Sequence, residues 1–428
     1  MTNQQFYILA VGVFLLAGSA VAGDIQSTAG LVLNLSGQVI ALDRGLSMRS
    51  GSYNILTLHK TVAEIEDRYL GYAWFPGNRF SGRAGNFIGR VTKYILLDCP
   101  IDYFSNVLAH EYFGHGARYR ELGISDIDYG YDRPPPYGPG GGQASANIGL
   151  GVVSTPEKVA IWSGGFEVQN ILNRQTRLYW FERRQIHYRE AFRYFWCYQL
   201  QTNYIQSTAE ITTADQGLND PQAYIYLLNV LNGADGINDQ TLSVSDLIGR
   251  QKIDLIDPFL FIAVFIQLKT YLWDGNPTAS LPTLKLGPLD YLPALHLGYT
   301  PFGPEYHLEN YLQLGARSAL IDLRLGDNAF HQSWGGIELF VKNVCQAENL
   351  TIGLDINLWR QPELDLGTDT APSLTGGNGG AVFLQGYFDL AEYDYPVDIL
   401  FEFGYKSAGY LDGFALNAGP ILLAGIKF

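Results

Sequence analysis

The sequence predicts an α+β protein: an antiparallel transmembrane β-barrel of about 10–12 strands with an inserted helical domain. Three observations support this prediction. After residue 284, eight segments of roughly ten residues alternate apolar and polar side chains, which is typical of membrane-barrel strands. Between residues 100 and 275 the spacing of apolar residues is helical instead. The composition combines 48 Gly, 28 Tyr and 23 Phe with only 16% charged residues, which suits a sheet with aromatic girdles.

The N-terminus has the features of a secretory signal peptide over residues 1–22. A short apolar run at 8–17 is followed by Ala20-Val21-Ala22, an A-x-A cleavage pattern. No Lys or Arg precedes the run, which leaves a buried N-terminal helix as the alternative. Residues 23–99 are then predicted to supply N-terminal barrel strands, at 29–41 and 86–97, and a linker.

Residues 100–275 are predicted to form the helical domain. Pro100 and Asp102 suit a helix start, and a loop rich in Pro and Gly, at 134–142, suits a lid or a surface loop. Further helices are expected at about 186–208, at 221–232 after Asn219-Asp220-Pro221, and at 256–273. The last of these is apolar nearly all round, so it is buried in protein or lies against lipid.

One helix of this domain is predicted to approach another closely. Ser154 and Glu157 form a capping box that opens it. Gly164-Gly165 follows inside the helix, where paired glycines are unfavourable unless another backbone must come near. We expect the partner to be the helix that contains residues 110–115.

Residues 284–428 are predicted to be the C-terminal barrel strands. The segments are 289–299, 306–315, 317–326, 334–343, 350–358, 380–390, 397–406 and 414–428. The longest connection, 360–378, falls on the outer side when counted from a periplasmic C-terminus, as barrels require. Phe428 resembles the C-terminal aromatic residue of bacterial outer-membrane proteins. A soluble β-sandwich with one solvated face is the alternative.

The strongest chemical signal is His110-Glu111-Tyr112-Phe113-Gly114-His115. Neutral imidazoles bind Zn²⁺, and a nearby carboxylate takes the proton of an activated water. Positions i and i+5 diverge by about 140° on a regular helix. A π-bulge would bring both rings to one side, and Gly114 makes that distortion easier. The spacing therefore predicts a bulge between the two histidines.

The motif resembles the His-Glu-x-x-Gly-His motif of the dipeptidyl peptidase III metallopeptidases, a zincin-type site, at His110, Glu111, Gly114 and His115. The resemblance covers six residues. It implies that His110 and His115 are zinc ligands and that Glu111 is the general base. That family's third ligand is a glutamate in a Glu-Glu-x-x-x-Glu-like motif on a later helix, and no such motif is found here.

A third ligand is therefore sought on the glycine-containing helix. Glu167 is the first choice because it follows Gly164-Gly165, and Glu210 on a later helix is the second. Asn170, one turn beyond Glu167, is expected to orient a ligand. Arg118 is expected to form an ion pair or to reach a substrate carboxylate.

Together these patterns predict an outer-membrane zinc-dependent hydrolase, most simply a metallopeptidase, acting on a peptide or another amide or ester. The alternative is an outer-membrane pore or binding barrel whose helical insert is a plug. The lipid bilayer is the expected partner, and a net charge of −14 argues against nucleic acid. Three cysteines, Cys99, Cys197 and Cys345, define no disulfide framework, although a Cys99–Cys197 pair stays open.

Overall fold

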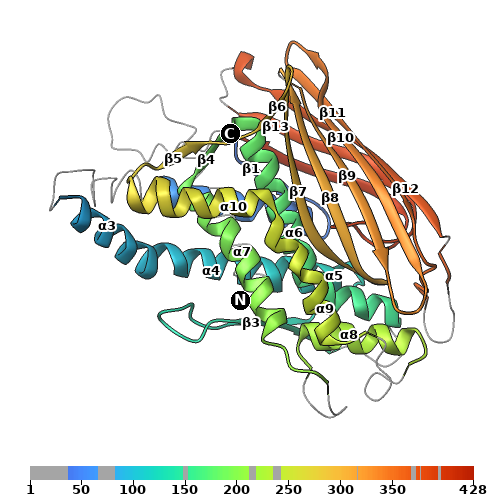
Figure 1. The fold of residues 1–428 in the computed structure, drawn as a ribbon. Helices are drawn as coiled ribbons and strands as arrows, with labels where there is room; N and C mark the ends of the chain where they lie inside the picture. Colours follow the sequence, from blue (N-terminus) through green and yellow to red (C-terminus); the bar gives the residue numbers. More distant parts are fainter. Residues whose placement is uncertain are drawn as a thin grey trace.

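The computed structural model describes residues 37–65, 82–147, 153–211, 218–234, 242–315, 317–367, 373–375, 377–393 and 397–428. The protein is α+β, with its helices packed on one side of a large, curved antiparallel sheet (Figure 1). The expected signal peptide, residues 1–22, lies outside the described residues.

Ten strands form the sheet, in the order β1-β14-β13-β12-β11-β10-β9-β8-β7-β6. Their bounds are β1 Val39–Leu42, β6 Leu284–Leu286, β7 Leu289–Thr300, β8 Gly303–Leu314, β9 Arg317–Asp327, β10 Ser333–Ala347, β11 Leu350–Arg360, β12 Asn378–Asp389, β13 Asp398–Lys406 and β14 Gly419–Lys427. The eight predicted C-terminal strands are confirmed. Within the described part of the chain, β1 and β6 are the two edges and do not pair, so the predicted closure into a barrel is wrong.

Side chains from outside the sheet bond to backbone groups near its two edges, so further strands are not needed to satisfy those groups. On β1, the side chains of Asn54 and Thr57 bond to backbone groups that a neighbouring strand would otherwise engage. On β7, the buried carboxylates of Asp254 and Asp257 accept backbone N–H groups of the strand. Helix side chains therefore take the place of the missing strands at both edges.

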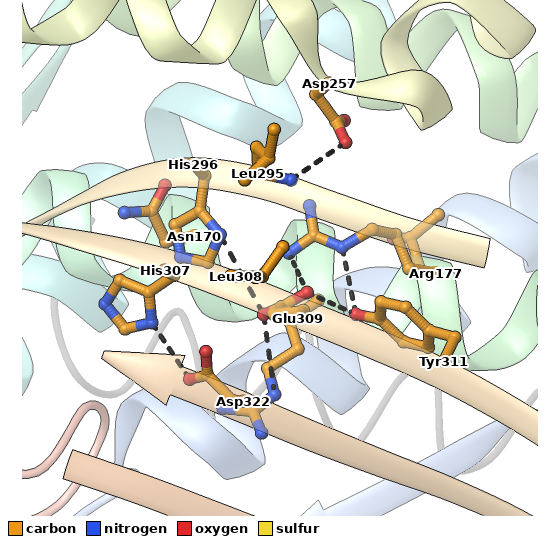
Figure 2. Close-up of polar contacts among 12 residues, drawn as sticks. Asn170, Arg177, Asp257, Leu295, His296, His307, Leu308, Glu309, Tyr311 and Asp322 are labelled. Carbon is orange, nitrogen blue, oxygen red and sulfur yellow. Dashed lines mark hydrogen bonds and ion pairs between the residues drawn. The ribbon is translucent and has the colours of Figure 1, made fainter. Parts of the chain in front are cut away.

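The two faces of the sheet differ in polarity. The inward face carries buried charged side chains, among them Glu309 and Asp322, which are fully buried. Glu309 pairs with Arg177 of the helical layer at 2.7 Å, and Asp322 pairs with His307 at 2.9 Å (Figure 2). The outward face carries exposed aliphatic and aromatic side chains at alternate positions, such as Leu325, which is 69% exposed. The inward face also carries apolar side chains, such as Leu292 and Leu320, which pack into the helical core. The sheet therefore differs from an ordinary soluble sheet in having a second apolar face that is uncovered.

The helical layer has the following elements. They are α2 Met48–Ile65, α3 Gly82–Lys93, π-helix η3 Tyr94–Asp98, α4 Cys99–Leu108, π-helix η4 Ala109–His115, α5 Gly116–Glu121, α6 Thr155–Arg183, α7 Tyr188–Gln206, α8 Asp220–Leu231, α9 Val244–Gln251, 3₁₀-helix η5 Lys252–Ile256, α10 Pro258–Phe265 and π-helix η6 Ile266–Trp273, with a short 3₁₀ turn η7 at Ala391–Tyr393. Two small antiparallel sheets accompany them, the hairpin of β2 Ile127–Tyr131 with β3 Gly142–Ala146 and the pair β4 Gln185–His187 with β5 Thr278–Ser280.

The predicted strand at 86–97 is wrong, because these residues form α3 and η3. Phe87, Val91 and Tyr94 recur at helical spacing and pack against a core shared by α7, α10, η6 and strands β7 to β9. Helix α6 runs beside β7 and β8 on the inward face of the sheet (Figure 1). The three cysteines are free, so no Cys99–Cys197 bond forms.

None of the described helices alone has the length and hydropathy of a membrane span. One bent pair, Val244–Ile256 with Pro258–Trp273 at 61°, meets both measures when taken together.

Candidate metal centre

The predicted bulge between the two histidines is present. Residues Ala109–His115 form a π-helix, η4, that continues from α4 into α5 without a break in the helical backbone. The wider turn rotates His115 back towards His110, and their Nε2 atoms lie 3.2 Å apart. The extra residue between the two histidines is therefore accommodated by the π-helix, and the π-helix brings the two rings together.

Glycines on two helices make this arrangement possible. A Cβ atom at Gly114 would lie 2.6 Å from the Cα of Gly165 and 2.7 Å from the carbonyl oxygen of Gly164. A Cβ atom at Gly165 would lie 2.3 Å from the His110 ring. The prediction that Gly164-Gly165 admits the histidine helix is confirmed. Gly165 also provides the space that the His110 imidazole occupies.

A carboxylate completes the group, and it belongs to Asp220. Its Oδ2 lies 3.0 Å from Nε2 of His110 and 3.2 Å from Nε2 of His115. Among the described residues these three side chains form a buried group with ligand atoms within 4.8 Å of one another. Ligand atoms bound about 2.0–2.1 Å from a tetrahedral metal ion lie about 3.4 Å apart, so the group has the size needed to hold a metal ion.

The second nitrogen of His115 supports the same assignment. Its Nδ1 is 2.6 Å from the carbonyl oxygen of Ile161 on α6. In the neutral ring this contact places the proton on Nδ1 and leaves the Nε2 lone pair free for a metal. The capping box of Ser154 and Glu157, which is confirmed, begins the helix that carries Ile161.

Charge binds the group together in the absence of a metal. Burial alone would raise the pKa of Asp220, but the two imidazoles, His115 above all, outweigh burial and hold that pKa well below its usual range. Burial alone would lower the pKa of His115, yet the Asp220 carboxylate raises it to about 9. A cation that replaces the His115 proton therefore meets an ionised carboxylate already in place.

Asp220 was missed from the sequence, where Asn219-Asp220-Pro221 was interpreted only as a helix start. That interpretation is confirmed, because Asn219 caps α8 and Asp220 is its first residue. The backbone of Asp220 is also held in place by Tyr204, because the Asp220 N–H donates to the Tyr204 hydroxyl at 3.2 Å. An acidic residue in the first turn of a helix was the one signal available.

Glu167 does not lie at the centre, which corrects the expected third ligand. Arg118 donates to both carboxylate oxygens of Glu167, with Nε 3.1 Å from Oε2, and the Gly413 backbone N–H donates at 2.7 Å. The ion pair expected of Arg118 is therefore present, and it joins α5 to α6. Glu167 lies about 200° around the helix from Gly165, which packs on His110, so its side chain points elsewhere.

The other expected candidates also have structural partners. Glu210 accepts the backbone N–H groups of Val244 and Ser245 at 3.0 and 2.9 Å, at the start of α9. Asn170 donates to the backbone of β7 at 2.9 Å and orients no ligand. Neither residue belongs to the His110, His115 and Asp220 group.

Glu111 is buried beside this group, under the β2–β3 hairpin. A Cβ atom at Gly142, the first residue of β3, would lie 2.8 Å from Cγ and 3.1 Å from Oε1 of Glu111. Glycine at this point therefore lets the hairpin backbone reach the side chain. On the other side the rings of Phe166 and Tyr204 approach His110, with centroids 5.5 and 6.2 Å away.

No protein family, curated protein or solved structure matches the chain. The inference about function therefore depends on the geometry of this centre.

Proposed function

We propose that the protein is a zinc-dependent hydrolase, most simply a metallopeptidase, with His110, His115 and Asp220 as the metal ligands. The observation that carries the proposal is the spacing of these three ligand atoms, with the two histidines brought together by the π-bulge and Glu111 next in sequence to the first ligand. Structural zinc normally has four protein ligands, whereas a catalytic zinc has three. The three found among the described residues therefore favour catalysis.

Each side chain then has a separate role. When bound, zinc supplies a Lewis acid that polarises water and the carbonyl group of the substrate. Ile161 fixes the His115 tautomer, and the Gly165 gap fixes the His110 ring. Glu111 is outside the ligand group, so its carboxylate serves as general base and then returns the proton to the leaving group. The hairpin above Glu111 limits the access of bulk water.

The test separates ligand from base. Glu111→Gln should retain stoichiometric zinc while hydrolysis of a casein or peptide-library substrate falls by about 10²–10⁴-fold. Asp220→Asn should lose zinc and activity together. Glu210→Gln, an acidic residue outside the centre, is the matched control and should keep both. Full activity in Glu111→Gln, or wild-type protein without bound metal, would refute the proposal. Amide and ester substrates of lipid or cell-wall type belong in the same assay, because the site itself specifies no peptide.

We further propose that the sheet is embedded in a bacterial outer membrane. The support is the outward face of the sheet, which exposes apolar side chains at alternate positions, while charged side chains are buried on the inward face. Fractionation of cell envelopes on a density gradient tests it, and recovery in the soluble periplasmic fraction would contradict it.

The plugged pore remains the second candidate because α6 lies along the inward face of the sheet. A cavity of about 190 Å³ lies between part of α6 and the sheet, lined by charged residues that include Arg49, Arg174, Glu338 and Asp355. Stable ion conductance in planar bilayers, with no hydrolysis of any substrate tested, would favour the pore. Hydrolysis without conductance would favour the enzyme.

A further inference from the structure

The outward surface of α10 and η6 has the same character as the outward face of the sheet. Phe261, Phe265 and Leu268 recur at helical spacing and are 61%, 62% and 59% exposed. The opposite face is also apolar, because Phe259 and Ile266 are buried in the helical core. A helix that is apolar all round belongs in a protein core or in a membrane, and this one has only half of its surface covered.

The element is joined directly to the edge of the sheet. Asp257 caps the N-terminus of α10 through the Leu260 N–H at 3.2 Å, and the same carboxylate accepts the N–H of Leu295 in β7 at 3.3 Å (Figure 2). Helix α10 therefore begins beside β7, the last long strand at this end of the sheet, which is followed only by the three-residue strand β6. The exposed surface of α10 and η6 therefore continues the apolar outward face of the sheet.

The other end of the element is fixed in a similar way. The buried Arg90 of α3 donates to the carbonyl oxygens of Leu272 and Trp273, at 2.8 to 3.1 Å, where η6 ends. The Trp273 ring meets that of Phe87 at 5.9 Å. Helix α3 therefore lies beside η6, and its exposed Ile88, which is 63% accessible, extends the apolar surface.

The dimensions and the charges agree with a wall element. Pro258–Trp273 comprises sixteen residues, about 24 Å at ~1.5 Å per residue, close to the roughly 25 Å apolar band of an outer-membrane barrel. Its exposed charge, Lys269, pairs with Asp274 at the C-terminal end. A lysine at the end of such a helix extends its ammonium group to the headgroup region.

We infer that α10 and η6 form a helical part of the membrane wall, in which lipid acyl chains contact Phe261, Phe265 and Leu268 as they contact the outward face of the sheet. The inference rests on the proposed location of the sheet in the outer membrane. Acyl chains are the occupant that fits, because the apolar surface passes from strands to helices around the molecule. A single folded protein partner would have to encircle both.

Fluorescence quenching by lipid tests the inference in the full-length protein. Single cysteines replace Phe265 on the helix, Leu325 on the sheet and the exposed Asp128 on the β2–β3 hairpin, in a Cys99→Ser, Cys345→Ser background. Each is labelled with bimane and reconstituted into phosphatidylethanolamine–phosphatidylglycerol vesicles that contain nitroxide-labelled acyl chains. All three sites are at the surface, and circular dichroism confirms that each labelled protein is folded.

The inference predicts loss of most bimane fluorescence at Phe265→Cys and Leu325→Cys, with the Asp128→Cys label unaffected. Quenching at Leu325→Cys without quenching at Phe265→Cys would overturn the helical wall and leave the membrane location standing. Absence of quenching at both positions would overturn the membrane location as well. Quenching at the helix alone would refute a wall shared by strands and helices.

Discussion

Gly165→Ala is the perturbation whose effect follows most directly from the structure. The added Cβ would lie 2.3 Å from both Cε1 and Nε2 of His110, so the ring must move by about 1 Å to reach ordinary van der Waals contact. Metal–ligand distances normally lie within about 0.2 Å of their usual values, so a shift of this size removes the ring from binding distance. We therefore expect zinc affinity to fall by about 10–100-fold, the range seen when ligand positioning is lost. Overpacking should also cost about 1–3 kcal/mol of unfolding free energy.

The assay is a zinc competition titration against a chromogenic chelator, combined with denaturant unfolding of the metal-free protein. Gly249→Ala is the matched control, because this helical glycine has open space where the Cβ would go. That variant should bind zinc normally and gain up to about 1 kcal/mol from helix propensity. If Gly165→Ala bound zinc as tightly as the wild type in a folded protein, His110 would not be a ligand in the observed geometry.

Three further predictions concern charge. Asp257→Ala removes the cap of α10 and an acceptor for β7, and should destabilise the protein by about 3 kcal/mol in denaturant unfolding. Arg177→Met removes the nearer of the two arginines that pair with the fully buried Glu309 carboxylate, leaving Arg174 at 3.8 Å, and should cost about 3 kcal/mol, most of it recovered when Glu309 is also made Gln. Zinc binding near pH 7 should release about one proton, seen by calorimetry in buffers of different ionisation enthalpy, because His115 has a pKa of about 9 without metal. The proton release should vanish above pH 9 or so, where His115 is already neutral. In the metal-free protein, the imidazolium should contribute its full stability below about pH 6.5 and lose that contribution as the pH rises through about 9.

The strands could be predicted from the sequence because a period of two is a local property. Leu350 to Leu358 shows it without any knowledge of neighbours, and β11 is found there. Closure could not be predicted in the same way. It depends on whether the edges find other partners for their backbone groups, and here Asn54 and Asp257, which lie outside the strands, provide side-chain partners instead. The helical stretch 86–97 misled for a related reason, since a short apolar run fits either period.

In the metal centre too, the local features could be predicted from the sequence and the long-range ones could not. The π-bulge and the close approach at Gly164-Gly165 could be predicted, because both follow from residues within one or two turns of helix. Asp220 could not, because only the packing of α8 against α6 brings it within 3.2 Å of the histidines. Glu167 was close in sequence to the correct glycine, but Arg118 binds its carboxylate.

The central claim is that His110, His115 and Asp220 together hold a zinc ion. X-ray absorption at the zinc edge measures this directly in the purified protein. The account predicts two imidazole ligands and light oxygen donors at about 2.0–2.1 Å with no sulfur, loss of one imidazole in His115→Ala, and a changed oxygen shell in Asp220→Asn. A zinc bound through sulfur, or a spectrum unchanged in both variants, would place the metal elsewhere and contradict the account.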